Sequence, residues 1–220
     1  MAATDLRPAL AEIGRALALD LTEPQLDTLL AYLALLQRWN ATYNLTAVRD
    51  PADMLKHHLA DCLAVIGPLR GHGTTTPPQR VLDVGSGGGL PGIVIAALNP
   101  GVRVVCVDTV GKKAAFIRQV GGELGLKNLF AEHARVEQLK AAPFDVIVSR
   151  AFASLDDFTR LTRKHLAPQG VWMAMKGKVP DDEMAQLPAE LAVFHVEHLS
   201  VPGLQAERCL VWIRPQTPSL

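Results

Sequence analysis

The sequence has few cysteines and no long hydrophobic runs, and both absences narrow its class. Its three cysteines, Cys62, Cys106 and Cys209, are far apart and none belongs to a C-x-x-C pair. An odd number of isolated cysteines argues against a disulfide framework and against a zinc site, so we expect three buried thiols and no metal. No stretch of about 18 uninterrupted apolar residues is present, which argues against a transmembrane helix.

The sequence also lacks an excess of either charge. Its 22 Lys and Arg residues balance 22 Asp and Glu residues, so the formal net charge is zero. This argues against a protein that coats nucleic acid through bulk charge, although a local basic patch remains compatible with it. The first residues show no basic segment followed by an apolar run, as a signal peptide would, so we expect a cytoplasmic protein without membrane contact.

Helical patterns dominate the chain from residue 5 to about residue 66. Thr22 is a suitable N-cap and Gln25 stands at the capping-box position, so a helix is predicted to begin here. The leucines that follow recur every three or four residues and form one apolar stripe. Asp50, which precedes a proline, predicts the start of another helix. We therefore expect a helical appendage over residues 1–69.

The pattern changes after residues 70–79, RGHGTTTPPQ, whose glycines, prolines and threonines are typical of a linker. Beyond them, short Val- and Ile-rich runs alternate with helical segments, which predicts a parallel sheet covered by helices on both faces. Residues 191–199 and 208–215 predict two further strands that pair antiparallel at the sheet edge. We expect an α/β domain over residues 80–214, followed by a tail, residues 215–220.

A glycine-rich segment, VLDVGSGGGLPG at residues 81–92, includes the first of these strands and opens a helix. Gly85, Gly87 and Gly89 are spaced G-x-G-x-G, and glycines permit positive φ and close approach of a ligand to the backbone. The dinucleotide fingerprint G-x-G-x-x-G would need a glycine where Leu90 stands, which weighs against the alternative of an NAD-binding Rossmann domain.

Carboxylates stand at the ends of two predicted strands. Asp83 precedes the glycines, where it can meet a cationic group of a ligand, and Asp108 ends the next strand, where it can accept both hydroxyls of a ribose. A strand, a glycine loop, a helix, a strand and an acid in this order predict an adenosine-containing ligand. A tight turn followed by a solvated aspartate is the alternative.

Four stretches share motifs with known enzymes: WNATYNLTAVRDP (39–51), HLAD (58–61), LDVGSGGGLPGI (82–93) and VIVSRAFASL (146–155). The chain resembles class I S-adenosylmethionine-dependent methyltransferases, and more closely the ribosomal RNA small subunit methyltransferase G family, also called glucose-inhibited division protein B. The resemblance covers most of the chain. It implies a Rossmann-like, mostly parallel seven-stranded sheet, S-adenosylmethionine as cofactor, and methyl transfer to N7 of one guanine in 16S ribosomal RNA.

The resemblance also implies roles for individual residues. Gly85 and Leu90 would lie in the cofactor loop, and Val136 and Glu137 would line the adenine end of the cofactor. Arg150 would reach the cofactor or the target base from the end of the fourth strand, which makes it the candidate catalytic residue. The partner of this enzyme, expected to be a monomer, would be small-subunit ribosomal RNA, within the small ribosomal subunit or an assembly intermediate.

Four more residues are candidates for the substrate side: Asn44, His58, Asp61 and Lys176. Asn44 fits the C-terminal cap of a helix, or a place near the site. His58 and Asp61 lie three residues apart, so on a helix they can pair, either as a surface ion pair or as a cap over the cofactor pocket. Lys176 follows the fifth strand at the carboxyl edge of the sheet, where ligands of open α/β sheets bind.

The implied reaction agrees with the residues. N7 of guanine has a free lone pair and no proton, so attack on the methyl group needs no general base, and positioning supplies much of the rate. The fourth strand ends Val148-Ser149-Arg150, not in the Asn/Asp-Pro-Pro-aromatic motif of amino-group methylation, and the loops after the fourth and fifth strands lack the cysteine of carbon methylation. The alternative is a methyltransferase that acts on a small molecule or a protein.

Overall fold

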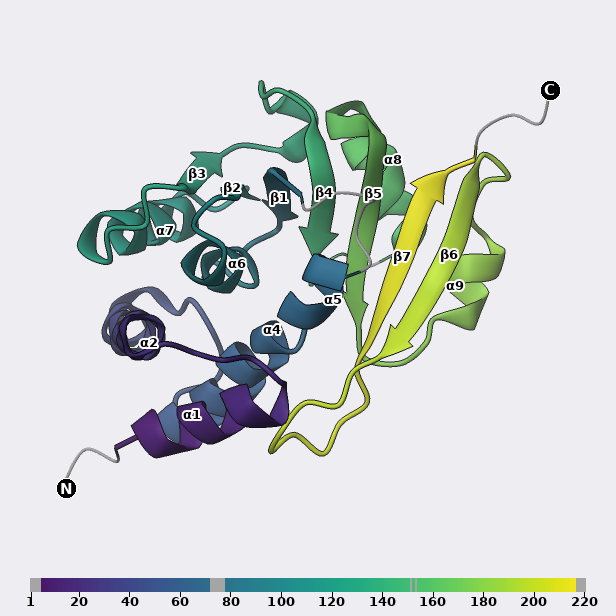
Figure 1. Cartoon of the computed structure of the whole chain (residues 1–220). Helices are drawn as coiled ribbons and strands as arrows, with labels where there is room; N and C mark the ends of the chain where they lie inside the picture. The colour runs from purple at the N-terminus through teal and green to yellow at the C-terminus, as the bar shows by residue number, and fades with distance from the viewer. Residues whose placement is uncertain (1–4, 72–77, 151, 153, 217–220) are drawn as a thin grey trace.

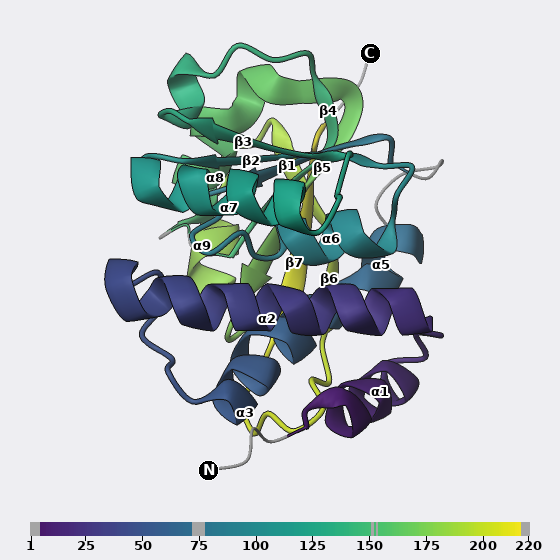
Figure 2. The same cartoon turned by 90° about the vertical axis from the view of Figure 1, so that its left-hand side faces the viewer.

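The computed structural model describes residues 5–71, 78–150, 152 and 154–216 (Figure 1). Most of the expected linker and of the expected tail therefore lies outside the described residues. The described elements form one sheet with helices on both faces, and the N-terminal helices stack on one side of it (Figures 1 and 2).

The N-terminal part is helical, as predicted. Its elements are α1 (Arg7–Ala16), α2 (Glu23–Tyr43), α3 (Pro51–Met54), the π-helical turn η1 (Leu55–Ala60), α4 (Asp61–Leu63) and α5 (Ile66–Gly71). At the start of α2, the Thr22 amide donates to Oε1 of Gln25 (3.0 Å), as expected for a capping box. At the start of α3, Oδ1 of Asp50 accepts hydrogen bonds from two backbone amides. Both predicted helix starts are confirmed.

Seven strands form one sheet in the order β3-β2-β1-β4-β5-β7-β6. They are β1 (Arg80–Val84), β2 (Arg103–Asp108), β3 (Leu129–His133), β4 (Phe144–Ser149), β5 (Leu166–Lys176), β6 (Leu191–His198) and β7 (Cys209–Pro215). From β3 to β5 in this order, each pair of neighbouring strands is parallel, whereas β7 runs antiparallel to both β5 and β6. The expected sheet, mostly parallel and with an antiparallel final pair, is confirmed.

Helices cover both faces of the sheet because successive strand residues point to opposite sides. The connecting elements are α6 (Gly92–Leu98), α7 (Gly111–Glu123), the 3-10 turns η2 (Val136–Gln138) and η3 (Arg163–His165), α8 (Leu155–Thr162) and α9 (Asp181–Ala185). Val104 of β2 packs in the same apolar cluster as Phe116 of α7, while the next residue, Val105, packs with Phe158 of α8. Helix α8 therefore covers one face of the sheet, and α6 and α7 cover the other.

The N-terminal helices share their core with the sheet domain. Leu29 and Leu36 of α2 belong to the same buried cluster as Ile93 of α6 and Phe116 of α7. Figure 2 shows α2 lying across α6 and α7, with α1 beyond it. Apolar packing therefore sets the position of the appendage over one face of the sheet.

Helix α2 ends at Asn44, which has the left-handed conformation (φ +49°), as expected of the C-terminal cap that the sequence predicts. Two other features differ from the sequence-based expectation. Helix α5 continues through Gly71, so it includes the first residues of the expected linker. Helix α9 was not predicted, because a helix of five residues is too short to show an apolar period.

The other structural expectations concern the cysteines and the membrane. Cys62, Cys106 and Cys209 are buried and form no disulfide, which confirms the prediction of three buried thiols. Among the described residues, no helix has both the length and the apolar character needed to span a membrane.

Gly89 is expected to be essential for the stability of the glycine loop. It has φ +88°, and a Cβ at this position would lie 2.2 Å from Cδ1 of Ile93. Gly89→Ala should lower the free energy of unfolding by about 2–4 kcal/mol, because left-handed strain and overpacking add. Urea denaturation measures the change. Gly101→Ala, where a Cβ has nothing within 4 Å, is the matched control, and equal stability of the two variants would contradict the prediction.

Candidate active site

Two cavities open at the edge of the sheet where the parallel strands end. The first, which we call the glycine-loop cavity, has a volume of about 480 Å³ and lies over the ends of β1 and β2 and the segment after β3. Four of the predicted cofactor residues line it: Gly85, Asp108, Val136 and Glu137. The structure therefore brings together residues that are spread over about fifty positions of the sequence.

The glycine loop presents its backbone to this cavity. Gly85 has φ +70° and Gly87 has φ +58°, the left-handed region that glycine adopts without strain. The Gly85 amide donates to the Val107 carbonyl (2.9 Å), and the Gly87 amide donates to Oδ2 of Asp108 (2.9 Å). These bonds hold the loop against the end of β2.

Asp108 is oriented from two sides. Besides the bond to the loop, its Oδ1 accepts a hydrogen bond from the Val110 amide (2.8 Å), and Nζ of Lys113 lies 3.8 Å from Oδ2. The residue is 7% exposed and borders the cavity. The carboxylate is therefore fixed at a place from which it can accept the hydroxyls of a bound ribose.

Four other predicted cofactor residues, Gly87 among them, lie in or beneath the loop and do not line the cavity. Gly89 packs against Ile93, and Leu90 is buried in the apolar core. The Asp83 carboxylate is fully buried, where Oδ2 accepts a hydrogen bond from the Gly92 amide (2.9 Å) and Oδ1 has no partner among the described residues. Asp83 thus supports the start of α6 from beneath the loop and does not face the cavity.

Asp83 is expected to make the stability of the fold depend on pH. Burial raises the pKa of Asp83 from 3.8 to about 7, although the Gly92 amide and the charge of Arg150 oppose the rise. Between pH 4 and pH 7 Asp83 binds more protons in the folded state than in the unfolded state, so the contribution of Asp83 to stability falls as pH rises through this window. The full effect is about 4 kcal/mol. Asp83→Asn should remove this slope, which urea denaturation at several pH values measures, and an unchanged slope would contradict the assignment.

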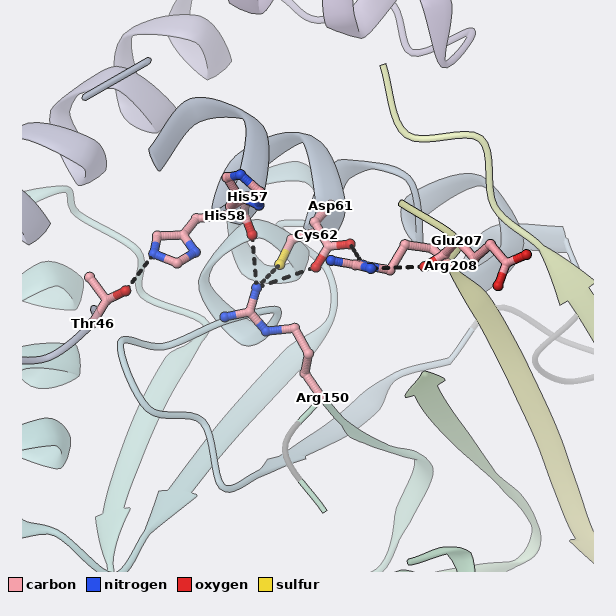
Figure 3. A network of polar contacts seen from close by, with 8 residues as sticks. All are labelled: Thr46, His57, His58, Asp61, Cys62, Arg150, Glu207 and Arg208. Atoms are coloured by element: carbon pink, nitrogen blue, oxygen red, sulfur yellow. Dashed lines mark hydrogen bonds and ion pairs between the residues drawn. The ribbon is translucent and has the colours of Figure 1, made fainter. Parts of the chain in front are cut away.

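The second cavity, which we call the arginine cavity, has a volume of about 400 Å³. It lies between the N-terminal helices and the ends of β5 and β7. Four predicted residues line it: His58, Asp61, Arg150 and Lys176. Figure 3 shows the first three of these, with the side chains that bind them.

Asp61 holds two arginines from distant parts of the chain. Its Oδ2 lies 3.4 Å from Nη1 of Arg150, and its Oδ1 accepts a hydrogen bond from Nε of Arg208 (2.8 Å) (Figure 3). Nη1 of Arg150 also donates to the His57 carbonyl (3.3 Å). This network joins α4, the end of β4 and the start of β7. Because two guanidinium groups share one carboxylate, it carries a net positive charge beside the cavity.

The surface ion pair between His58 and Asp61, one of the two sequence-based alternatives, is wrong. Both side chains are buried, and each binds another residue of the described chain: Asp61 binds the arginines, and Nε2 of His58 lies 2.8 Å from Oγ1 of Thr46. The cause is tertiary, because Arg150 and Arg208, which are distant in the sequence, bind the Asp61 carboxylate instead.

Lys176 and Asn44 have different surroundings. Nζ of Lys176 donates to both carboxylate oxygens of Glu183 (2.9 and 3.0 Å), so the charge that the arginine cavity receives from Lys176 is balanced. Asn44 is exposed, lines neither cavity, and accepts a hydrogen bond from Nη2 of Arg49 (3.0 Å). It is the C-terminal cap of α2, and its neighbour Thr46 reaches the arginine cavity instead, through His58.

The thiols near the arginine cavity are poor nucleophiles. Burial raises the pKa of Cys62, and it also raises the pKa of Cys209, which lines the cavity. Nucleophilic attack needs the thiolate, so neither cysteine fits the nucleophile of carbon methylation. Within the described ranges, no group of three or more His, Cys, Asp or Glu side chains could hold a metal ion.

The two cavities border on the same short segment after β4. Arg150 lines the arginine cavity, whereas Phe152 lines the glycine-loop cavity. Ligands in the two cavities would therefore lie on either side of this segment. The arrangement suits the transfer of a small group from a donor in one cavity to an acceptor in the other.

Two residues of the site were not predicted from the sequence. Arg208 lies 147 residues from Asp61, but it directly precedes β7, and an antiparallel final strand begins at the carboxyl edge of its parallel neighbours. The position of Arg208 before the final strand could therefore have indicated its place at this edge from the sequence. Tyr32 donates a hydrogen bond from its hydroxyl to the Gly88 carbonyl (2.9 Å) and so supports the glycine loop from α2. No sequence pattern indicates this contact.

Comparison with known proteins agrees with this geometry. A model of the family "rRNA small subunit methyltransferase G" matches residues 25–211. The chain belongs to this family. Relatives named ribosomal RNA small subunit methyltransferase G include one from Acidovorax sp. (strain JS42), 61% identical over 219 residues with 96% of each chain covered, and one from Leptothrix cholodnii, 61% identical over 204 residues with 93% of each covered.

Solved structures of more distant proteins share the fold of this chain. TrmN from Thermus thermophilus has a TM-score of 0.55 at 20% identity, with 70% of this chain and 48% of that chain covered. The ribosomal protein L11 methylase from Lactobacillus delbrueckii subsp. bulgaricus has a TM-score of 0.53 at 18% identity, with 70% and 77% covered. At these identities the likeness concerns the fold alone, which is that of a class I methyltransferase.

Proposed function

We propose that this chain transfers a methyl group from S-adenosylmethionine to N7 of one guanine in small-subunit ribosomal RNA. Membership of the rRNA small subunit methyltransferase G family supports the reaction and the substrate class. In this proposal the cofactor occupies the glycine-loop cavity and the target guanine enters the arginine cavity. The observation that carries the assignment is that both cavities border on the segment after β4, with Arg150 on one side and Phe152 on the other.

The residues of the glycine-loop cavity fit the chemistry of S-adenosylmethionine. Asp108 would accept the ribose hydroxyls, Val136 and Glu137 would border the adenine, and Gly85 has no side chain to block close approach of a ligand. When bound, the cofactor supplies an electrophilic methyl group, whose bond to sulfur breaks with its electrons left on sulfur as the bond to nitrogen forms.

The arginine cavity suits an acceptor that must be positioned but not deprotonated. N7 of guanine brings its own lone pair, so the reaction does not require a base in the cavity. Asp61 is bound by two guanidinium groups, and burial together with the charge of Arg150 lowers the pKa of His58 to about 4. Alignment alone can contribute about 7–11 kcal/mol to such a reaction.

Arg150 is the residue that we place nearest to the reacting atoms. It projects from the end of β4 into the arginine cavity, and Asp61 and the His57 carbonyl hold its guanidinium group. In this role it donates hydrogen bonds to the target nucleotide and fixes the base beside the cofactor. Lys176, held by Glu183, would border the RNA at the same edge.

We further propose that the enzyme is a cytoplasmic monomer that acts on the small ribosomal subunit or an assembly intermediate of it. The zero net charge supports a shaped, partly protein-bound target, because bulk charge would not hold free RNA. RNA is recognised mainly at loops and unpaired bases, which suits the modification of one exposed guanine. Residues 1–69 form the helical appendage in this scheme, and through His58 and Asp61 they supply one wall of the arginine cavity.

Methyl-labelled S-adenosylmethionine provides the direct test. The protein is incubated with this cofactor and with small ribosomal subunits from cells that lack the enzyme, and the labelled nucleoside is identified by mass spectrometry. We expect 7-methylguanosine at one site. Absence of label from the RNA, with cofactor binding intact, would reject the substrate but leave the methyltransferase fold. Turnover without any ribosomal component would instead favour a small molecule or a protein as acceptor.

The same assay distinguishes an assembled substrate from free RNA. We expect labelling of ribosomal particles to exceed labelling of naked, unstructured RNA of the same sequence, because the enzyme lacks the positive charge to order a free chain. Initial rates at equal concentrations of target guanine make the comparison. Equal rates would contradict the particle as preferred substrate.

A further inference from the structure

His58 carries a polar atom that the fold leaves unpaired. The side chain is 7% exposed and lines the arginine cavity. Its Nε2 lies 2.8 Å from Oγ1 of Thr46, whereas its Nδ1 has no hydrogen-bond partner among the described residues (Figure 3). Buried polar groups in folded proteins are nearly always paired, so an unpaired nitrogen on a cavity wall indicates a partner that arrives with a ligand.

The surrounding hydrogen bonds favour one tautomer of this ring. Oγ1 of Thr46 accepts a hydrogen bond from the Val48 amide (3.2 Å), and its own hydroxyl hydrogen can be donated to Nε2 of His58. The ring hydrogen is then on Nδ1. Burial and the neighbouring Arg150 keep the ring neutral, since they lower the pKa of His58 to about 4. At neutral pH the histidine therefore offers one N–H donor, at Nδ1.

The segment after α2 holds Thr46 in place. The Thr46 amide donates to Oδ1 of Asn40 (2.8 Å), and Nδ2 of Asn40 donates to the Val48 carbonyl (3.3 Å). Asn40 is 2% exposed, so this bracket is rigid and internal. The bracket lies in the WNATYNLTAVRDP motif, which has no part in the cofactor cavity. Its effect is to fix the orientation of the His58 ring.

Guanine and adenine differ at the atom next to N7. Guanine presents the acceptor O6 beside N7, whereas adenine presents the N6 amino donor. A donor that binds O6 therefore selects guanine and leaves the N7 lone pair free for methylation. A neutral N–H suits this task, because it adds no further positive charge beside a base that becomes positive on methylation.

We propose that His58 selects the target base: its Nδ1–H donates a hydrogen bond to O6 of the guanine in the arginine cavity. This inference rests on the proposed function, because it takes the arginine cavity as the place of the target base. His58 is then a substrate-binding residue, and Thr46 and Asn40 are positioning residues that act through it.

Two substitutions of similar size separate this role from a structural one. The amide nitrogen of Asn matches the position of Nδ1, and the amide of Gln matches the position of Nε2. His58→Asn therefore keeps a donor toward the cavity and loses the bond to Thr46, whereas His58→Gln does the reverse. With small ribosomal subunits as substrate, we expect His58→Gln to lower kcat/KM by about tenfold to a hundredfold, and His58→Asn to recover much of this loss. A structural role predicts the opposite order.

An atomic change in the substrate completes the test. Small subunits are reconstituted with 2-aminopurine, which lacks O6, at the guanine that the wild-type enzyme methylates. The wild-type rate should fall about tenfold or more, while the His58→Gln rate should hardly change further. Equal losses for the wild type and His58→Gln would overturn this inference but not the proposed function. Equal rates of His58→Gln and His58→Asn on guanine would do the same. Failure of the wild-type enzyme to methylate guanine at all would overturn the proposed function with it.

Discussion

Gly85→Asp is expected to abolish the binding of S-adenosylmethionine. Gly85 lies on the wall of the glycine-loop cavity with φ +70°. An aspartate there would fill the space beside the backbone and would add a negative charge near Asp108, which we expect to bind the ribose. Isothermal titration calorimetry with S-adenosylhomocysteine measures the effect, and the dissociation constant should rise by more than about a hundredfold, or about 2.7 kcal/mol.

Gly125→Asp is the matched control for this substitution. Gly125 also has a positive φ, +65°, but an added Cβ there would meet nothing within 4 Å. Both variants introduce an aspartate at a residue with a left-handed backbone conformation. The difference between their dissociation constants therefore measures the effect of a side chain in the glycine-loop cavity. If Gly85→Asp binds the cofactor as tightly as the wild type, the cofactor does not occupy the glycine-loop cavity and the assignment is wrong.

Arg150→Ala is expected to remove methyl transfer while the cofactor still binds. Arg150 lines the arginine cavity, whereas Phe152, two residues later in the chain, lines the glycine-loop cavity. We therefore expect kcat/KM for small ribosomal subunits to fall by about a hundredfold or more, which corresponds to about 2.7 kcal/mol of lost transition-state stabilisation. The dissociation constant of S-adenosylhomocysteine should change by less than about tenfold. Label transfer and calorimetry measure the two effects separately.

Two further variants define what Arg150 does. Arg150→Lys keeps the charge but loses the planar fork of donors, so its activity should lie between those of the wild type and the alanine variant. Arg38→Ala breaks an exposed ion pair with Glu123 and serves as the control for a lost surface arginine, with little change in activity. Wild-type activity of Arg150→Ala would show that this residue does not contact the reacting groups. Equal loss of cofactor binding and activity would place it in the cofactor site instead.

The elements with a strong local signal were predicted well. The capping position at Thr22 and the Asp50 cap set helix starts through hydrogen bonds within a few residues, so the sequence contains the whole cause. The same holds for β1 and β2, whose apolar runs are buried on both faces of the sheet. Helix α9 had no such signal, because a short helix is stabilised by its neighbours and not by its own period.

The cofactor side of the site was also visible in the sequence. The glycines and Asp108 lie close to the ends of consecutive strands, and parallel strands end at one edge, so their proximity follows from topology. The substrate side was predicted only in part. His58, Asp61 and Lys176 line the arginine cavity, but their partners Thr46, Arg208 and Glu183 come from other elements. Asn44 shares a motif with Thr46, yet only Thr46 turns toward the site.

The sequence by itself determined the class of the fold and the resemblance to one family, and it predicted the glycine loop and the end of β2 as the place for a cofactor. These follow from spacing and strand order, which are local or topological properties. Only the tertiary structure decided that Asp83 is buried beneath the loop, that Asp61 binds both Arg150 and Arg208, and that His58, which lines the arginine cavity, has an unpaired nitrogen among the described residues. The physical reason is that burial and hydrogen-bond partners depend on the packing of the N-terminal helices against the sheet, and side chains up to 147 residues apart meet only when that packing has formed.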